Sequence, residues 1–184
     1  MDTGAISFGH GVSVSAIQMV TAVSAIANGG LLMKPYIVQK IVNQNGQPVK
    51  RFKPQKVRRA ISAKAAKIVK NIMKTVITEG GTGVNAAIEG YSVGGKTGTS
   101  RKLDKNGQYS DNSHTASFIG FTPADNPEIA IIVVIDEPKG QYYGGIVAAP
   151  VFKQIAQQTL NYLNVPPDGG TTKFRVSLGS EAQG

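Results

Sequence analysis

The sequence contains no cysteine and no tryptophan, and only two of its 184 residues are histidine. Without cysteine there is no disulfide framework, no thiolate nucleophile and no zinc–thiolate centre. His10 and His114 lie far apart in the sequence, and single histidines of this kind are more often structural hydrogen-bonding residues than metal ligands. We therefore expect no metal site, and nothing else in the sequence indicates a cofactor.

Acidic residues are scarce too. The chain has 11 Asp and Glu against 20 Lys and Arg, which gives a formal net charge of +9. The basic residues cluster within residues 50–59 and again at Lys64, Lys67, Lys70 and Lys74. Such a cluster can bind nucleic acid, but only 7% of the chain is aromatic and no nucleic-acid-binding motif accompanies the charge. We therefore favour a solvated surface, or attraction to anionic membrane or wall polymers, over a nucleic-acid partner.

Charged residues are missing altogether from residues 3–33. This length could span a membrane, but polar residues interrupt it and glycines bracket its helical part, residues 14–28. We expect instead a buried helix of a soluble core, with Ser13 as its N-cap and Gly29 at its C-terminal end. The first residues, Met1–Gly4, also lack the basic segment that opens a signal peptide.

The rest of the sequence alternates between patterns typical of short strands and of helices. Strands are predicted over residues 36–42, 49–52, 56–61, 92–102, 115–121 and 128–136, and further helices over residues 63–79 and 146–163. The last three strands follow one another too closely for crossover helices, so we expect them to be antiparallel. These elements predict an α+β fold over residues 1–165, with an antiparallel β-sheet flanked by helices. Residues 166–184 are polar and are predicted to form a tail or linker.

Helical spacing also predicts which residues face the core. In the helix that Ser62 should cap, the predicted buried stripe is Ala65, Ile68, Val69, Ile72, Val76 and Ile77. In the last helix, Pro150 should start or kink the regular part because it has no backbone N–H. One face of that helix collects Val151, Ile155, Gln158 and Tyr162, and Phe152 and Leu163 lie near it. The hairpin that includes residues 50–59 has too few apolar residues for a core, so we expect it at the surface.

The most specific motif is Lys96-Thr97-Gly98-Thr99, which lies within a predicted strand. The side chains of Lys96 and Thr97 can hold one carboxylate through a charge-assisted and a neutral hydrogen bond. Gly98 has no Cβ, so the backbone of a bound molecule can approach the strand closely. The N–H of Thr99 is then available to a developing oxyanion. The motif therefore predicts a strand that binds a carboxylate.

The same residues also fit a second hypothesis. Gly90–Thr97 matches the phosphate-loop pattern G-x-x-x-x-G-K-[ST], and Asp136 and Glu137 follow an apolar run, as a magnesium-binding acidic pair does in nucleotide-binding proteins. A phosphate loop needs a strand before it and the N-terminus of a helix after it. Residues 85–89 are too short and too little β-branched for that strand, and the residues after the motif lead into an Asn106-Gly107 turn. A nucleotide-binding protein is therefore the weaker hypothesis.

Five stretches occur in a specific order: residues 7–19, 95–99, 116–123, 131–138 and 143–152. In this order and spacing they resemble the C-terminal half of the transpeptidase domain of class B penicillin-binding proteins, most closely the division or sporulation type. The resemblance extends from residue 4 to residue 165.

The resemblance implies a peptidoglycan D,D-transpeptidase whose serine attacks the D-Ala–D-Ala bond of a stem peptide and forms an acyl-enzyme. It implies that Lys96, Thr97 and Gly98 bind the carboxylate of the stem peptide or of a β-lactam, and that the Thr99 N–H is an oxyanion-hole donor. It also implies a parent protein anchored by an N-terminal helix at the extracytoplasmic face of the bacterial membrane. The implied partners are the N-terminal half of the same domain and cell-wall synthesis proteins.

One family element is missing from the chain. No serine is followed three residues later by lysine, as the Ser-x-x-Lys motif of the family nucleophile requires. The second element, Ser-x-Asn, matches Ser110-Asp111-Asn112, but it follows Lys96, whereas the family order places it before. We expect this match to be a chance one in a polar turn. The chain alone is therefore predicted to be inactive as a transpeptidase. A non-catalytic module that uses residues 50–59 on an anionic partner remains the other alternative.

Overall fold

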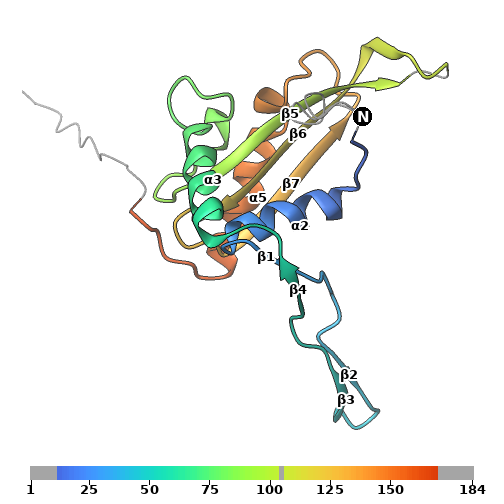
Figure 1. The fold of residues 1–184 in the computed structure, drawn as a ribbon, viewed down its shortest axis with the longest axis vertical. Helices are drawn as coiled ribbons and strands as arrows, with labels where there is room; N and C mark the ends of the chain where they lie inside the picture. The colour runs from blue at the N-terminus through green and yellow to red at the C-terminus, as the bar shows by residue number, and fades with distance from the viewer. Residues whose placement is uncertain (1–11, 104–105, 170–184) are drawn as a thin grey trace, which may run out of the picture.

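The computed structural model describes residues 12–103 and 106–169, apart from the side chain of Asp111. Its centre is an antiparallel sheet of three strands in the order β5-β6-β7 (Figure 1). The strands are β5 (Gly94–Leu103), β6 (Tyr109–Thr122) and β7 (Ile129–Asp136). The predicted antiparallel sheet and α+β class are confirmed, and the predicted Asn106-Gly107 turn joins β5 to β6, with Gly107 at a φ of 76°.

Helices cover both faces of this sheet (Figure 1). The helices α2 (Ala16–Ala27) and α3 (Ala63–Thr75) pack on one face, and α5 (Ala149–Tyr162) packs on the other. Strand β6 contributes to both cores because successive side chains point to opposite faces. The centroids of the Phe118 ring and the Phe152 ring of α5 lie 4.8 Å apart, whereas Phe121 packs with α2 and α3.

Helix α2 begins two residues later than predicted. Ser15, and not Ser13, is its N-cap, because Ser15 and Gln18 form a reciprocal capping box. The helix ends before Gly29, as predicted, and Gly29 has a φ of 77°, which glycine adopts without strain. Within the described ranges, no helix is both long and apolar enough to cross a membrane.

Helix α3 has the predicted cap, Ser62, whose side chain accepts from the Ala65 N–H at 3.1 Å. Its predicted buried face is partly wrong. Ala66 and Met73 are buried, whereas Ile68 and Ile72 are 51% and 59% exposed. The apolar face of this helix is wider than the surface that α2 and the sheet cover, so periodicity identified the face without deciding which part is packed.

The predicted C-terminal helix breaks at Ala148 into α4 (Gly144–Val147) and α5, and Pro150 lies in the first turn of α5, as its missing N–H predicts. The predicted face of α5 is only partly right. Phe152, which was expected near it, is buried with Ala149, Ala156 and Leu160, whereas Tyr162 is 84% exposed.

A basic arm extends away from the sheet (Figure 1). Strand β1 (Leu31–Met33) pairs with β4 (Lys56–Arg59), and farther out β2 (Lys40–Val42) pairs with β3 (Pro48–Arg51). Strand β1 was not predicted, and the strand predicted over residues 36–42 is limited to β2. Every residue of β2, β3 and β4 is exposed, which confirms the surface position of this hairpin.

The described C-terminal residues return to the body of the fold. The Tyr91 hydroxyl donates to the Val165 carbonyl at 2.7 Å, and the Ser92 N–H donates to Asp168 Oδ1 at 2.7 Å. The start of the predicted tail is therefore attached. The rest of it, from residue 170, lies outside the described residues, as does the stretch before residue 12.

Candidate functional site: the open edge of strand β5

The predicted site residues, Lys96–Thr99, lie near the start of β5, which is an edge strand within the described part of the chain. One edge of the strand pairs with β6, in a register that sets Lys96 opposite Ile119 and Thr99 opposite Ala116. The other edge has no strand beside it among the described residues. The backbone there is available to an added extended chain.

The side chains of β5 point alternately to the two faces of the sheet, which meet at this edge. A Cβ on Gly94 would lie 2.7 Å from the Phe121 ring, and one on Gly95 would lie 2.5 Å from the Phe118 ring on the opposite face. Because side chains alternate along a strand, Lys96 lies on the α2–α3 face, and Thr97 lies on the α4–α5 face. Lysine and threonine can therefore meet one carboxylate only at the open edge between the two faces.

Lys96 is exposed, and its ammonium group donates to the Thr97 carbonyl at 2.8 Å. No carboxylate within the described ranges forms an ion pair with it. The side chain thus follows the strand with its positive charge uncompensated, which suits a group that binds an anion.

The hydroxyl groups of Thr97 and Thr99 form hydrogen bonds with segments that are distant in the sequence. Thr97 Oγ1 lies 3.0 Å from Thr82 Oγ1, in the turn after α3. Thr99 Oγ1 accepts from the N–H of Gly144, at the start of α4, at 3.2 Å. Thr82 was missed because Gly80-Gly81 was interpreted as the end of the preceding helix, and the dinucleotide-like glycine spacing of residues 81–86 was discounted since it follows a helix. Gly144 lies within the last stretch that carried the family resemblance, so that stretch was the signal that could have identified it.

Gly98 and Gly144 both lie where a Cβ atom would collide with strand β6. A Cβ on Gly98 would lie 2.5 Å from Ser117 Oγ on β6, and one on Gly144 would lie 2.1 Å from the Ser117 carbonyl. Real Cβ atoms do not approach backbone atoms so closely, so α4 can lie against the sheet only because position 144 is glycine. A side chain at position 98 would point to the opposite face of the sheet and meet the Ser117 hydroxyl there.

A cluster of charges joins all three strands farther along the sheet. Lys102 Nζ donates to Glu137 Oε1 at 2.8 Å and to Asp136 Oδ2 at 2.9 Å. Hydrogen bonds from Lys102 and then Thr115 lower the pKa of Asp136, and hydrogen bonds to Glu137 and then Asp136 raise the pKa of Lys102. Asp136 and Glu137, the acidic pair of the nucleotide-binding hypothesis, thus bind Lys102.

This geometry overturns the nucleotide-binding hypothesis. The end of Gly90–Thr97 is part of a β-strand with an antiparallel neighbour, and a hairpin turn follows that strand where a phosphate loop needs a helix. Asp136 and Glu137 are engaged by Lys102, and the described residues contain no cluster of side chains that could hold a metal ion.

The Ser-x-Asn match lies in strand β6, so its predicted position in a polar turn is wrong. The Asn112 N–H donates to Ser110 Oγ at 3.2 Å. Leu103 of β5 pairs with Tyr109 of β6, so Ser110 and Asn112 lie near the turn that joins these two strands. That position is well beyond Lys96 along β5, so the structure does not bring this match to the predicted site.

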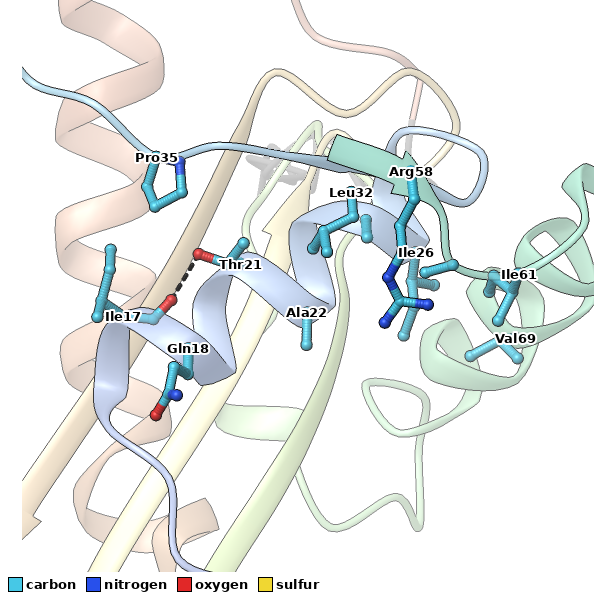
Figure 2. A pocket seen from close by; sticks show the side chains of 12 residues that line it. Ile17, Gln18, Thr21, Ala22, Ile26, Leu32, Pro35, Arg58, Ile61 and Val69 are labelled. Carbon is cyan, nitrogen blue, oxygen red and sulfur yellow. Dashed lines mark hydrogen bonds between the residues drawn. The ribbon is translucent and has the colours of Figure 1, made fainter. Parts of the chain in front are cut away.

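A groove of about 670 Å³ lies between α2, α3 and the β1–β4 pair (Figure 2). Its lining is mostly apolar, and Figure 2 shows Arg58 extending into it from β4. The lining residues include Ile17, Ala22, Ile26, Leu32, Ile61 and Val69. Ile17, at one end of the groove, is 56% exposed, so apolar surface is open to solvent there.

The basic arm beside the groove has no acidic residue of its own. The chain contains no Asp or Glu between Asp2 and Glu79. Lys40 lies directly opposite Arg51 across β2 and β3, a like-charge pair that weakens the ribbon. Lys50 Nζ lies 5.0 Å from the centre of the Phe52 ring, a cation–π contact.

Comparisons of the sequence and the structure with known proteins all point to one protein family. Residues 1–157 match the family model of the penicillin-binding protein transpeptidase domain. Stage V sporulation protein D of Bacillus subtilis (strain 168) is 45% identical over 163 residues, which are 88% of this chain and 25% of that protein. The probable peptidoglycan D,D-transpeptidase PenA of Neisseria gonorrhoeae is 39% identical over 181 residues, which are 98% of this chain and 29% of that protein.

Among solved structures, penicillin-binding protein 3 of Mycobacterium tuberculosis in complex with aztreonam is similar, with a TM-score of 0.79 and 32% sequence identity. The match covers 88% of this chain and 38% of that one. The chain thus spans well under half the length of these relatives, and the α+β fold described above is the fold of the part that it matches.

Proposed function

The chain belongs to the family of penicillin-binding protein transpeptidase domains, and on that basis we propose that it is the carboxylate-binding part of a D,D-transpeptidase that cross-links peptidoglycan stem peptides. The observation that carries this proposal is the open edge of β5, which a cation reaches from one face and hydroxyl groups reach from the other. No cofactor is required, since serine acyl transfer needs only a nucleophile, a base and an oxyanion site.

In this proposal the stem peptide lies along β5 as an added strand. Its terminal carboxylate binds the Lys96 ammonium group and the Thr97 hydroxyl, a charged and a neutral donor that converge at the edge. Addition of a peptide to a sheet edge provides backbone hydrogen bonds, and the side chains at the edge provide the selectivity. A β-lactam, which also carries a carboxylate, binds in the same place. A solved structure of a similar protein holds a β-lactam, aztreonam, which supports β-lactam binding by this family.

The Thr99 N–H is proposed as an oxyanion donor. Lys96 Nζ reaches the Thr97 carbonyl, so that carbonyl is accessible from the edge where Lys96 lies. Residues two apart in a strand present their N–H and C=O groups to the same edge, which assigns the Thr99 N–H to that edge as well. There it can stabilise the oxyanion that forms when a serine attacks the D-Ala–D-Ala carbonyl, and a donor of this kind is worth roughly 3–4 kcal/mol.

The attacking serine is not in this sequence, because no Ser-x-x-Lys is present. We propose that it belongs to the N-terminal half of the same domain, and that this half covers the apolar groove and the exposed Ile68 and Ile72 of α3. Burial of such a surface stabilises an assembly in proportion to its apolar area. The chain by itself is therefore proposed to be inactive.

Stage V sporulation protein D and the D,D-transpeptidase PenA are named for sporulation and for peptidoglycan chemistry. We propose a corresponding place for the parent protein at the extracytoplasmic face of the bacterial membrane, with cell-wall synthesis proteins as partners and without nucleic acid. The basic arm lies inside the region that matches the transpeptidase family, so a separate binding module for an anionic partner is not favoured.

The test is a chimeric domain in which residues 1–165 of this chain replace the matching region of stage V sporulation protein D. We expect a fluorescent penicillin to label the chimera covalently and to leave the isolated chain unlabelled. Lys96→Ala should slow labelling by about 10- to 100-fold, since a hydrogen bond to a charged group is worth about 1.5–3 kcal/mol. Lys153→Ala, at an exposed lysine on α5, is the matched control. A folded chimera that resists labelling, or a labelled isolated chain, would contradict the proposal.

A further inference from the structure

The turn after α3 places one hydroxyl directly against the proposed carboxylate site. Thr82 Oγ1 and Thr97 Oγ1 are 3.0 Å apart, although the residues belong to different elements. Either oxygen can be the donor while nothing is bound. The family assignment does not explain this contact, and no pattern in the sequence indicated it.

The backbone around Thr82 packs against α3, the core and α4. The Gly83 N–H donates to the Val76 carbonyl at 2.9 Å, which ties the turn to the end of α3. A Cβ on Gly83 would lie 2.8 Å from the Phe118 ring, and a Cβ on Gly145 would lie 2.1 Å from the Thr82 carbonyl. The turn is therefore held between the core and α4, which holds the backbone that carries the Thr82 hydroxyl.

Helix α4 also determines how Thr97 is oriented. A Cβ on Gly145 would lie 3.4 Å from Thr97 Cγ2, so the methyl group of Thr97 faces α4. Its hydroxyl then faces Thr82. The carbonyl of Gly145 accepts from Asn85 Nδ2 at 2.8 Å, and this bond joins α4 to the same turn. One rotamer of Thr97 is thus selected by contacts on both sides.

We propose that Thr82 is a positioning residue for the Thr97 hydroxyl, an inference that rests on the proposed function. A hydroxyl has one proton to donate. When Thr97 donates that proton to a carboxylate at the edge of β5, the hydrogen bond to Thr82 can persist only if Thr82 donates to Thr97 Oγ1. In such a chain each hydrogen bond polarises the next, so the Thr97 hydroxyl becomes a better donor toward the anion.

The test uses the chimeric domain and two probes that differ in one group: a penicillin with its free carboxylate, and the methyl ester of the same penicillin. Thr82→Val removes the donor and keeps the shape of the side chain. We expect it to slow acylation by the free acid about five- to tenfold, the value of one hydrogen bond, with less than about a twofold change for the ester. Thr82→Ser should restore the rate with the acid. Thr97→Val combined with Thr82→Val should be no slower than Thr97→Val alone.

The outcomes separate this inference from the proposed function. Equal slowing with both probes indicates a structural role only and overturns the inference, as does an unchanged rate with the acid. If the unmodified chimera folds but is not acylated at all, the proposed function itself fails. Should Thr82→Val not fold, as judged by its thermal transition, Thr82→Ala provides the same comparison between the acid and the ester.

Discussion

The hydroxyl of Thr99 accepts a hydrogen bond from the N–H of Gly144 at 3.2 Å, across 45 residues of sequence. This bond joins the strand that carries the proposed oxyanion donor to the first turn of α4. The neighbouring Gly145 lies against both Thr82 and Thr97. The short helix α4 therefore backs the candidate site, and the geometry of the site depends on how closely α4 can approach the sheet.

Gly145→Ala should disturb the site because the new Cβ would lie 2.1 Å from the Thr82 carbonyl. Overpacking of this kind costs about 1–3 kcal/mol. We expect the chimeric domain to lose about that much free energy of unfolding in urea, and to be acylated more slowly. Ile146→Ala is the control, since Ile146 lies in the same helix and is 50% exposed. Equal stability of Gly145→Ala and the unmodified domain would show that α4 can move away from the turn without cost.

The charge cluster of Lys102 should make the far end of the sheet dependent on pH. The pKa of Asp136 is lowered, chiefly by its hydrogen bond from Lys102, so its stabilising contribution is present above the ordinary carboxyl pKa and is lost as pH falls through the lowered value. The pKa of Lys102 is raised, chiefly by Glu137, so its contribution is present below the ordinary lysine pKa and is lost as pH rises through the raised value.

Lys102→Met should therefore speed amide hydrogen exchange at the β5–β6 hairpin near neutral pH, and the difference from the unmodified domain should shrink in strong acid. Lys102 is half-buried and both carboxylates are exposed, so the effect should be small and should weaken further at high salt. Lys139→Met is the control, because Lys139 is an exposed lysine that follows the cluster in sequence. A difference that persists unchanged below the lowered carboxyl pKa would mean that the lysine acts through packing and not through charge.

The apolar groove should make the isolated chain associate with itself. Exposed apolar side chains line the groove and one face of α3, and Ile17 and Ile72 are 56% and 59% exposed. We expect Ile17→Ser with Ile72→Ser to shift the isolated chain toward the monomer in sedimentation velocity, since less apolar area is available for association. Val49→Ser, on the basic arm, is the matched control for an exposed apolar residue. A monomeric unmodified chain at micromolar concentration would argue against this surface as an interface.

We expect residues 170–184 of the predicted tail to be dispensable for stability, and the residues just before them to be needed. Removal of residues 170–184 should leave the free energy of unfolding unchanged. Removal from residue 165 onward deletes the partners of the Tyr91 hydroxyl and the Ser92 N–H. Hydrogen bonds contribute about 0.5–1.5 kcal/mol each, so we expect a loss of about 1–3 kcal/mol in urea unfolding of a chimeric domain that carries residues 1–184 of this chain. Equal stability of the two truncations would place the start of the tail before residue 165.

Much of the candidate site was predictable because its chemistry lies in consecutive residues. The order lysine, threonine, glycine, threonine within a strand pattern already predicted a cation, hydroxyls and a close backbone approach. The short spacing between strands predicted antiparallel pairing, and that pairing excluded a phosphate loop. The Asn106-Gly107 turn and the Ser62 cap are likewise local features, fixed by residues a few positions apart.

What the sequence determined by itself was most of the elements, the antiparallel hairpin and the identity of the motif, because each depends on interactions between near neighbours in the chain. Tertiary structure alone decided which residues of α3 and α5 are buried and that Thr82 meets Thr97. These outcomes depend on how closely distant segments can pack. Where α4 meets the turn after α3, that distance is set by Gly145, whose missing side chain carries no periodic signal.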